Sequence, residues 1–153
     1  MISHSEVRTR IRAGTILALS VRQPWPWCMS IPCDAAKDIE NRSWRTNVRG
    51  TVLVHASGGM TPEEYEFCLA YCREVALIRP FPSGLTMPSF GEFQRGGIVG
   101  AVEIVDCVKT SDSPWFMGPW GFVLRNYQSL PFIPCRGMPG FFKPTLTEAQ
   151  AAE

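Results

Sequence analysis

Short runs of hydrophobic residues, separated by turns rich in proline and glycine, dominate the pattern of this chain. Such runs, bounded by turn signals, are typical of buried strands. They predict strands at residues 15–21, 50–56, 96–108, 122–125, 130–135 and 140–143. The 96–108 run is long enough to curve around a barrel, and Gly100 marks a place where it can bend.

Two segments have the pattern of a helix. Thr61-Pro62-Glu63-Glu64 is a helix start, with a hydroxyl cap, a proline in the first turn and a glutamate that can reach back to the cap. Apolar residues then recur at helical spacing and predict an amphipathic helix over 61–77: Tyr65, Cys68, Leu69, Cys72 and Ala76. A short helix is also predicted after Gln23, because Pro24 or Pro26 can occupy its first turn.

The remaining segments are predicted to be tails and loops. Residues 1–14 carry three arginines at alternating positions and are predicted to be a flexible basic N-terminal tail. Prolines and glycines break residues 79–95 into a loop. Residues 144–153 are polar and are predicted to be a C-terminal tail. The folded domain is therefore expected to span residues 15–143.

The order of these elements predicts the fold class. Several strands with one or two helices, and no regular alternation of strand and helix, indicate an α+β fold built as a small mixed β-barrel with one or two flanking helices. The 153 residues, of which 45% are hydrophobic, suit one globular domain. No apolar run reaches the roughly 20 residues that span a bilayer, and residues 1–14 lack the apolar core of a signal peptide. We therefore expect a cytoplasmic protein without a membrane partner.

Charge and cysteine spacing argue against two kinds of site. The formal net charge is +1, whereas a long duplex held by charge neutralisation needs many unopposed lysines and arginines. The six cysteines are Cys28, Cys33, Cys68, Cys72, Cys107 and Cys135. Cys28 and Cys33 are close in sequence, as are Cys68 and Cys72, but neither pair has the two-residue spacing of a zinc knuckle. We therefore expect reduced, mostly buried thiols, with no metal and no cofactor.

Residues 37–44 carry the charges that best suit a binding site. Lys37 offers a compact positive charge, Glu40 a hydrogen-bond acceptor, and Arg42 a planar guanidinium with several donors. Together they can hold a phosphate and bind the donor edge of a base. Strand alternation places Lys37 on one side and the other two on the opposite side. Stacking on an aromatic face is worth about 1–3 kcal/mol per base, and the candidate faces are Trp25, Trp44, Trp115 and Trp120. The alternative, which spacing alone favours, is that Glu40 forms surface ion pairs worth under about 1 kcal/mol while the tryptophans fill the core.

Three segments together resemble the ASCH domain family (activating signal cointegrator homology). They are Leu19-Ser20-Val21-Arg22-Gln23-Pro24-Trp25, then Lys37-x-x-Glu40-x-Arg42, then Arg49-Gly50 followed by a strand that ends in His55-Ala56. Segments at 97–107, 115–124 and 134–142 fit as well, so the resemblance covers residues 15–143. One position departs from the family motif, which usually has glycine two residues before the lysine. Ala35 stands there, and we expect a reshaped turn.

The resemblance implies a PUA-like β-barrel whose cleft binds RNA or single-stranded nucleic acid. In this hypothesis Lys37, Arg42 and Arg49 lie near phosphate or base, Glu40 accepts from base N–H groups, and a tryptophan stacks. The candidate ligand-binding residues are Ser20, Gln23, Trp25, Lys37, Glu40, Arg42, Trp44, Arg49, His55 and Trp115. The expected partner is RNA, single-stranded nucleic acid or a nucleoside-like small molecule.

Two other functions stay open. Proteins similar to the ASCH family include an amidohydrolase that acts on acetylated cytidine and members that cut RNA. In the amidohydrolase branch the lysine activates a threonine, where this chain has Glu40; Lys37 and Glu40 would then be catalytic, with Glu40 as a general base on water. Nearby hydroxyls are those of Ser20, Ser43 and Thr46. The third function is a protein-interaction domain that uses exposed proline and tryptophan loops.

Overall fold

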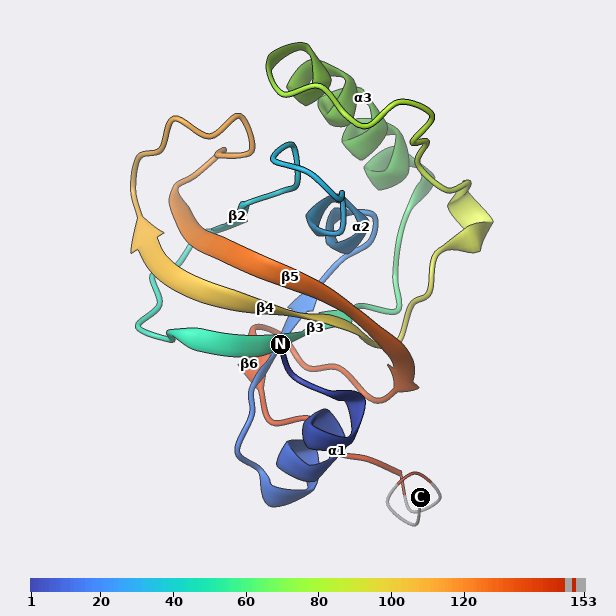
Figure 1. The fold of residues 1–153 in the computed structure, drawn as a ribbon, viewed down its shortest axis with the longest axis vertical. Helices are drawn as coiled ribbons and strands as arrows, with labels where there is room; N and C mark the ends of the chain where they lie inside the picture. Colours follow the sequence, from blue (N-terminus) through green and yellow to red (C-terminus); the bar gives the residue numbers. More distant parts are fainter. Residues whose placement is uncertain (148–149, 151–153) are drawn as a thin grey trace.

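The computed structural model describes residues 1–147 and 150. Within these residues, six strands form one curled, mixed sheet, accompanied by three α-helices and a short 3-10 helix (Figure 1). The strands are β1 (Ala18–Val21), β2 (Ile39–Arg42), β3 (Gly50–Ala56), β4 (Gly97–Val108), β5 (Trp120–Pro134) and β6 (Phe141–Phe142). The helices are α1 (His4–Ala13), α2 (Trp25–Met29), α3 (Pro62–Ile78) and the 3-10 helix η1 (Phe90–Glu92). The α+β class is confirmed, with three α-helices in the described part rather than one or two.

The sheet order is β2-β5-β4-β3-β1-β6, and the long antiparallel strands β4 and β5 curve across its centre (Figure 1). Strands β1 and β3 are parallel, with Ala18 opposite Leu53. A parallel pair needs a long crossover connection, and here residues 22–49 provide it, with α2 and β2 inside. The pattern showed no sign of this pair, because a single crossover produces no regular alternation of strand and helix.

Two of the predicted strands, 122–125 and 130–135, belong to one continuous strand, β5. The pairing register between β4 and β5 shifts at three places, and Asn126 has a φ of 58° between the two predicted segments. A bulge keeps strands paired while it bends them and re-aims side chains. The other predicted strands and helix α3 are confirmed, with small differences at their ends.

The N-terminal segment 1–14 is a helix, not the flexible tail that we expected. The hydroxyl of Ser3 caps α1, and Gly14 ends it in the left-handed conformation that glycine adopts readily. Val7 and Ile11 are buried in the core. The prediction was wrong because it weighed the alternating arginines, whereas the apolar residues four positions apart share one helical face.

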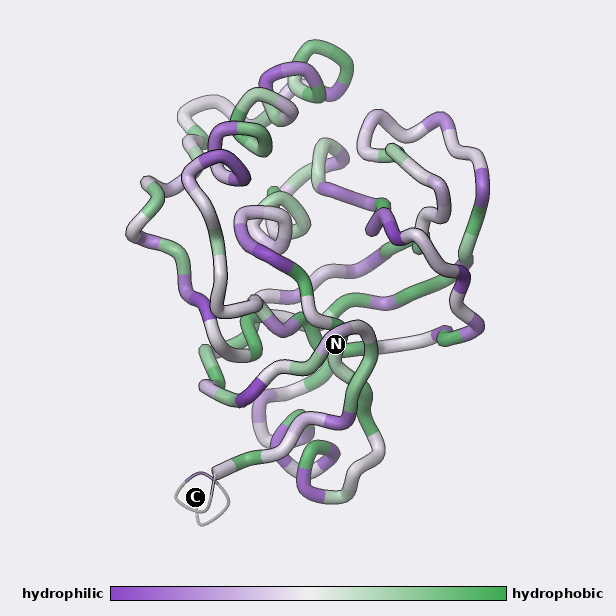
Figure 2. The backbone as a smooth tube through the Cα atoms, turned by 180° about the vertical axis from the view of Figure 1, so that it is seen from behind, coloured by the Kyte–Doolittle hydropathy of each residue, from purple (hydrophilic) through white to green (hydrophobic). Residues whose placement is uncertain are grey.

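The core has three hydrophobic clusters. One lies under α1, one inside the curled sheet, and one between α2 and α3. Figure 1 shows α1 on one side of the sheet and α2 with α3 on the other, and Figure 2 shows hydrophobic stretches gathered in the central strands. Within the predicted C-terminal tail, Pro144 is buried and Leu146 packs against the cluster under α1; residues 148–149 and 151–153 lie outside the described residues.

Among the helices of the described residues, none has the length and apolar character that crossing a bilayer requires.

Candidate functional site

A buried ion network joins the three charged residues that the sequence singled out. Oε1 of Glu40 accepts from Nζ of Lys37 at 2.8 Å, and Oε2 accepts from two nitrogens of Arg42 at 3.0 and 2.8 Å. The side chains of Lys37, Glu40 and Arg42 are 2%, 9% and 18% exposed. One carboxylate thus lies between two cations, and this ion network carries a formal charge of +1 away from most of the solvent.

Strand β2 and the turn before it position the network. Glu40 and Arg42 are two residues apart in β2 and share one side of it, as the alternation predicted. Lys37 precedes the strand, so the alternation does not govern its side chain. Its ammonium reaches Glu40 and also donates to the Ile39 carbonyl. The expectation that Lys37 points away from Glu40 was therefore wrong.

Ala35 occupies the expected glycine position without backbone strain. Among the described residues, Asn126 is the one non-glycine residue with a positive φ, so the turn at Ala35 does not require glycine. The Ala35 carbonyl accepts a hydrogen bond from Nε1 of Trp115 at 3.0 Å. This contact fixes the turn that leads into Lys37.

The surroundings of Glu40 keep it ionised. Burial by itself would raise the pKa of Glu40, but the charges of Lys37 and Arg42, and the hydrogen bonds from them, outweigh burial and hold the pKa below its usual value. A carboxylate with a lowered pKa is a poor proton acceptor near neutral pH. The network therefore suits charge complementarity better than general-base chemistry.

An open hollow of about 540 Å³, which we call the aromatic hollow, lies beside the network. The buried Lys37 and Glu40 lie at its base, and Trp25 of α2 and Phe67 of α3 form an aromatic wall with ring centroids 6.2 Å apart. Nζ of Lys37 is 5.8 Å from the centre of the Trp25 ring. Phe67 is 55% exposed, so the rim of this wall faces solvent.

The rim of the aromatic hollow is acidic. Glu63 and Glu64, from the first turn of α3, both line it. Glu64 is paired with Arg22 at 2.6 Å. The rim therefore repels a phosphate close to α3 and favours the hydrogen-bond donors of a ligand.

Ser20 and His55 belong to a different hollow. The Ser20 hydroxyl donates to the Met138 carbonyl at 2.6 Å, while the Ser20 carbonyl accepts from Arg42 at 2.6 Å. His55 is buried, with Nε2 2.8 Å from the Cys135 carbonyl. Both side chains line a concavity beside residues 135–139. The backbone of Ser20 thus supports the ion network, but its side chain and His55 do not join it.

Gln23 and Arg49 also lie apart from the aromatic hollow. Gln23 is buried and donates to the Gln94 carbonyl at 3.0 Å, which ties the end of β1 to the 79–95 loop. Arg49 is partly exposed and donates to the Thr46 carbonyl at 3.1 Å. Neither side chain is among those that line the hollow.

The predicted tryptophans lie in different surroundings. Trp25 lines the aromatic hollow. Trp115 is completely buried and packs on Tyr71 at 5.7 Å between ring centroids, so it has no free face for a base. Trp44 is partly exposed, and the guanidinium carbon of Arg42 lies 5.9 Å from the centre of its ring.

The sequence analysis missed five residues that line the aromatic hollow: Asn41, Glu63, Glu64, Phe67 and Met117. Asn41 donates to the Trp115 carbonyl at 2.9 Å and accepts from the Met117 N–H at 2.8 Å, so it connects the β4–β5 loop to β2. The signal for Phe67 was present, because it is a large aromatic residue outside the apolar stripe of α3. Asn41 and Met117 gave no such signal.

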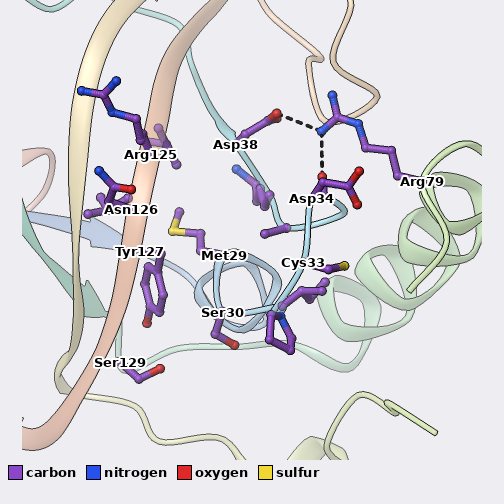
Figure 3. A pocket seen from close by; sticks show the side chains of 16 residues that line it. Met29, Ser30, Cys33, Asp34, Asp38, Arg79, Arg125, Asn126, Tyr127 and Ser129 are labelled. Carbon is purple, nitrogen blue, oxygen red and sulfur yellow. Dashed lines mark hydrogen bonds and ion pairs between the residues drawn. The ribbon is translucent and has the colours of Figure 1, made fainter. Parts of the chain in front are cut away.

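A second hollow, of about 720 Å³, also reaches Lys37. Figure 3 shows Arg125, Tyr127 and Ser129 of β5 on one side of it and the α2–β2 loop on the other. Arg79, at the end of α3, closes part of its edge through a 2.9 Å ion pair with Asp38. Burial raises the pKa of Tyr127 to about 12, although a hydrogen bond with Ser129 opposes the shift.

The hydroxyls considered for hydrolysis are not placed for it. No hydroxyl side chain of the described residues lines the aromatic hollow. Ser20 is hydrogen-bonded to Met138, and the Thr46 hydroxyl accepts from the Val48 N–H at 3.0 Å. The aromatic hollow therefore offers charge and aromatic surface, but no serine or threonine nucleophile among the described residues that line it.

Comparison of the chain with protein-family models gives no match, and comparison with curated proteins gives none either.

Proposed function

We propose that the aromatic hollow binds the base of a nucleotide or of a short single strand of RNA. One observation carries the proposal: Lys37 and Glu40, which belong to a buried ion network of charge +1, lie at the base of an open hollow with an aromatic wall. Aromatic faces stack on any base, and charge-assisted hydrogen bonds orient polar ligands. The resemblance to the ASCH family, and a curled mixed sheet compatible with a PUA-like barrel, support the same function.

The hydrogen-bonding capacity of the base of the hollow suits a planar ligand. Lys37 uses two of its three N–H donors inside the protein, one on Ile39 and one on Glu40. Each oxygen of Glu40 retains acceptor capacity beyond the bonds it receives. One donor thus lies beside one acceptor, a pair that can read the edge of a base while Trp25 and Phe67 hold its face.

The charges on the rim also bear on the position of a bound phosphate. Glu63 repels a phosphate beside α3, whereas Glu64 is paired with Arg22, so we expect the phosphate to lie away from α3. With few positive groups available, the ligand makes about one or two phosphate contacts, and its affinity depends only weakly on salt.

Substitution of Phe67 tests the proposal without disturbing the core. We expect Phe67→Ala to weaken the binding of short RNA by about fivefold to a hundredfold, because stacking is worth about 1–3 kcal/mol per base. Leu77→Ala is the matched control, since Leu77 is 86% exposed on the same helix and does not line the hollow. Affinities come from fluorescence titration of labelled RNA and of single nucleotides.

Two results would contradict the proposal. The first is equal affinity of Phe67→Ala and Leu77→Ala for every ligand, and the second is failure of the unaltered protein to bind any of them. We further expect N4-acetylcytidine and short RNA to be recovered unchanged after incubation with the protein. Product formation that Lys37→Met abolishes would replace the binding function with a hydrolase.

A further inference from the structure

Three cysteine side chains from two helices meet in a buried cluster. Sγ of Cys28, in α2, lies 3.5 Å from Sγ of Cys68 and 3.5 Å from Sγ of Cys72, both in α3. All three sulfurs lie within 4.8 Å of one another, and no other histidine, cysteine, aspartate or glutamate of residues 1–147 and 150 contributes an atom to the cluster. The three residues are buried. We call this group the thiol cluster.

The fold, rather than sequence spacing, creates the cluster. Cys68 and Cys72 are one turn apart on α3 and share its buried face. Cys28 is held against them by α2, and its carbonyl accepts from the Lys37 N–H at 2.9 Å. Cys33, which the spacing had grouped with Cys28, is exposed. A single buried cysteine is ordinary apolar packing, but three converging sulfurs form a ligand set.

We propose that Cys28, Cys68 and Cys72 form a three-thiolate site for a thiophilic d10 metal ion, Zn²⁺ or Cu⁺. Zinc–sulfur bonds are about 2.3 Å long, which places two sulfurs of a tetrahedral site about 3.8 Å apart. The two separations of 3.5 Å from the Cys28 sulfur match after a small outward movement, and all three sulfurs lie within 4.8 Å of one another. A disulfide needs sulfurs about 2.05 Å apart, so it requires a larger inward movement and leaves the third thiol without a partner.

Charge balance favours the metal and connects it to the ion network. Binding of Zn²⁺ by three thiols releases three protons and leaves a site of charge −1. The ion network of Lys37, Glu40 and Arg42 has charge +1, and Lys37 interacts electrostatically with Cys68. A buried charge is tolerated when an opposite charge lies nearby. Cu⁺ leaves a charge of −2, which this network balances less well.

The site would hold together the two helices that wall the aromatic hollow. Trp25 lies three residues before Cys28 in α2, and Phe67 directly precedes Cys68 in α3. A metal bound to both helices fixes the separation of these rings. The metal site and nucleic-acid binding are nevertheless tested separately, because the metal readouts require no nucleic acid.

Metal uptake by the reduced, metal-free protein tests the site. We expect about one Zn²⁺ per chain, measured by competition with a chromophoric chelator and by elemental analysis, together with a higher midpoint of thermal unfolding. A parallel anaerobic titration with Cu⁺ identifies the preferred ion. Co²⁺ provides a spectroscopic check, since sulfur-to-cobalt charge-transfer absorption grows with the number of thiolates bound.

Two single substitutions make the test specific to the cluster. Cys72→Ser is expected to lower the affinity for the ion at least tenfold and to weaken the charge-transfer band, whereas Cys33→Ser leaves both unchanged. If Cys72→Ser does not fold, the Co²⁺ spectrum of the unaltered protein decides the matter. The proposal is overturned if the reduced protein takes up neither ion in stoichiometric amount, or if Cys33→Ser lowers uptake as much as Cys72→Ser.

Discussion

Two buried polar clusters, the ion network and the thiol cluster, differ in how their groups are satisfied. In the ion network, both oxygens of Glu40 accept from cations at 2.8–3.0 Å. In the thiol cluster, the Cys28 sulfur lies 3.5 Å from each of the other two, and a thiol is a weak hydrogen-bond donor. In the first cluster each charge already has a partner of opposite sign, whereas the second gains most of its bonding energy from an added ion.

The difference shows how each cluster would respond to the loss of one member. A buried pair strengthened by low dielectric is costly to break, because the remaining charge stays buried without a partner. A neutral thiol that loses its neighbour remains a small apolar group. The ion network should therefore be sensitive to single substitutions with or without metal at neutral pH, and the thiol cluster mainly when metal is present.

The largest loss in the free energy of unfolding is expected from Glu40→Gln. The substitution leaves Lys37 and Arg42 without a negative partner, and we expect a loss of about 3–5 kcal/mol in the free energy of unfolding, measured by urea denaturation. The double variant Lys37→Met with Glu40→Gln should lose less, because Arg42 reaches solvent and still donates to the Ser20 carbonyl. A loss below about 1 kcal/mol for Glu40→Gln would mean that solvent satisfies the network.

A smaller loss in the free energy of unfolding is expected at acid pH. Burial raises the pKa of Glu40, but Lys37 and Arg42 lower it further, so the folded pKa lies below the unfolded value of about 4.3. The ionised carboxylate therefore stabilises the fold fully above that value, and this contribution is lost as pH falls through the folded pKa.

This linkage is measured as the stability of the unaltered protein and of Glu40→Gln between about pH 5 and about pH 3. As the pH falls over this range, the unaltered protein should lose more stability than Glu40→Gln. The plots of unfolding free energy against pH for the two proteins should therefore converge. Parallel curves would show that Glu40 has the same pKa in the folded and unfolded chains.

The smallest effect is expected from Glu64→Gln. The Arg22–Glu64 pair is as short as any in the ion network, at 2.6 Å, but both side chains are substantially exposed. We expect a change under about 1 kcal/mol in the free energy of unfolding, reduced further by salt. A loss as large as that of Glu40→Gln would mean that the distance between the charges, rather than their burial, sets how much an ion pair contributes to the free energy of unfolding.

Local patterns predicted most of the fold. The Thr61 cap, the proline positions around Trp25 and the hydrophobic runs located α3, α2 and the strands, since each depends on neighbours within a few residues. The bulge at Asn126 and the parallel pairing of β1 with β3 could not be read from the sequence, because both depend on pairing between distant segments.

The same distinction applies to the candidate site. Lys37, Glu40 and Arg42 lie within six positions, and the structure brings them together. His55, Arg49 and Gln23 do not join them, because their surroundings are set by other strands and loops. The thiol cluster lay beyond sequence reasoning, since Cys28 is 40 positions from Cys68 and nothing local aligns them.

The crossover between β1 and β3 is a longer connection than the one between β4 and β5. Strands β4 and β5 are joined by residues 109–119, whereas the parallel strands β1 and β3 are joined by the longer segment 22–49. Closing the longer segment costs more conformational entropy, and non-local pairings of this kind form slowly. Because the crossover holds Trp25, Lys37 and Glu40, we expect the hollow to form after β4 and β5 have paired.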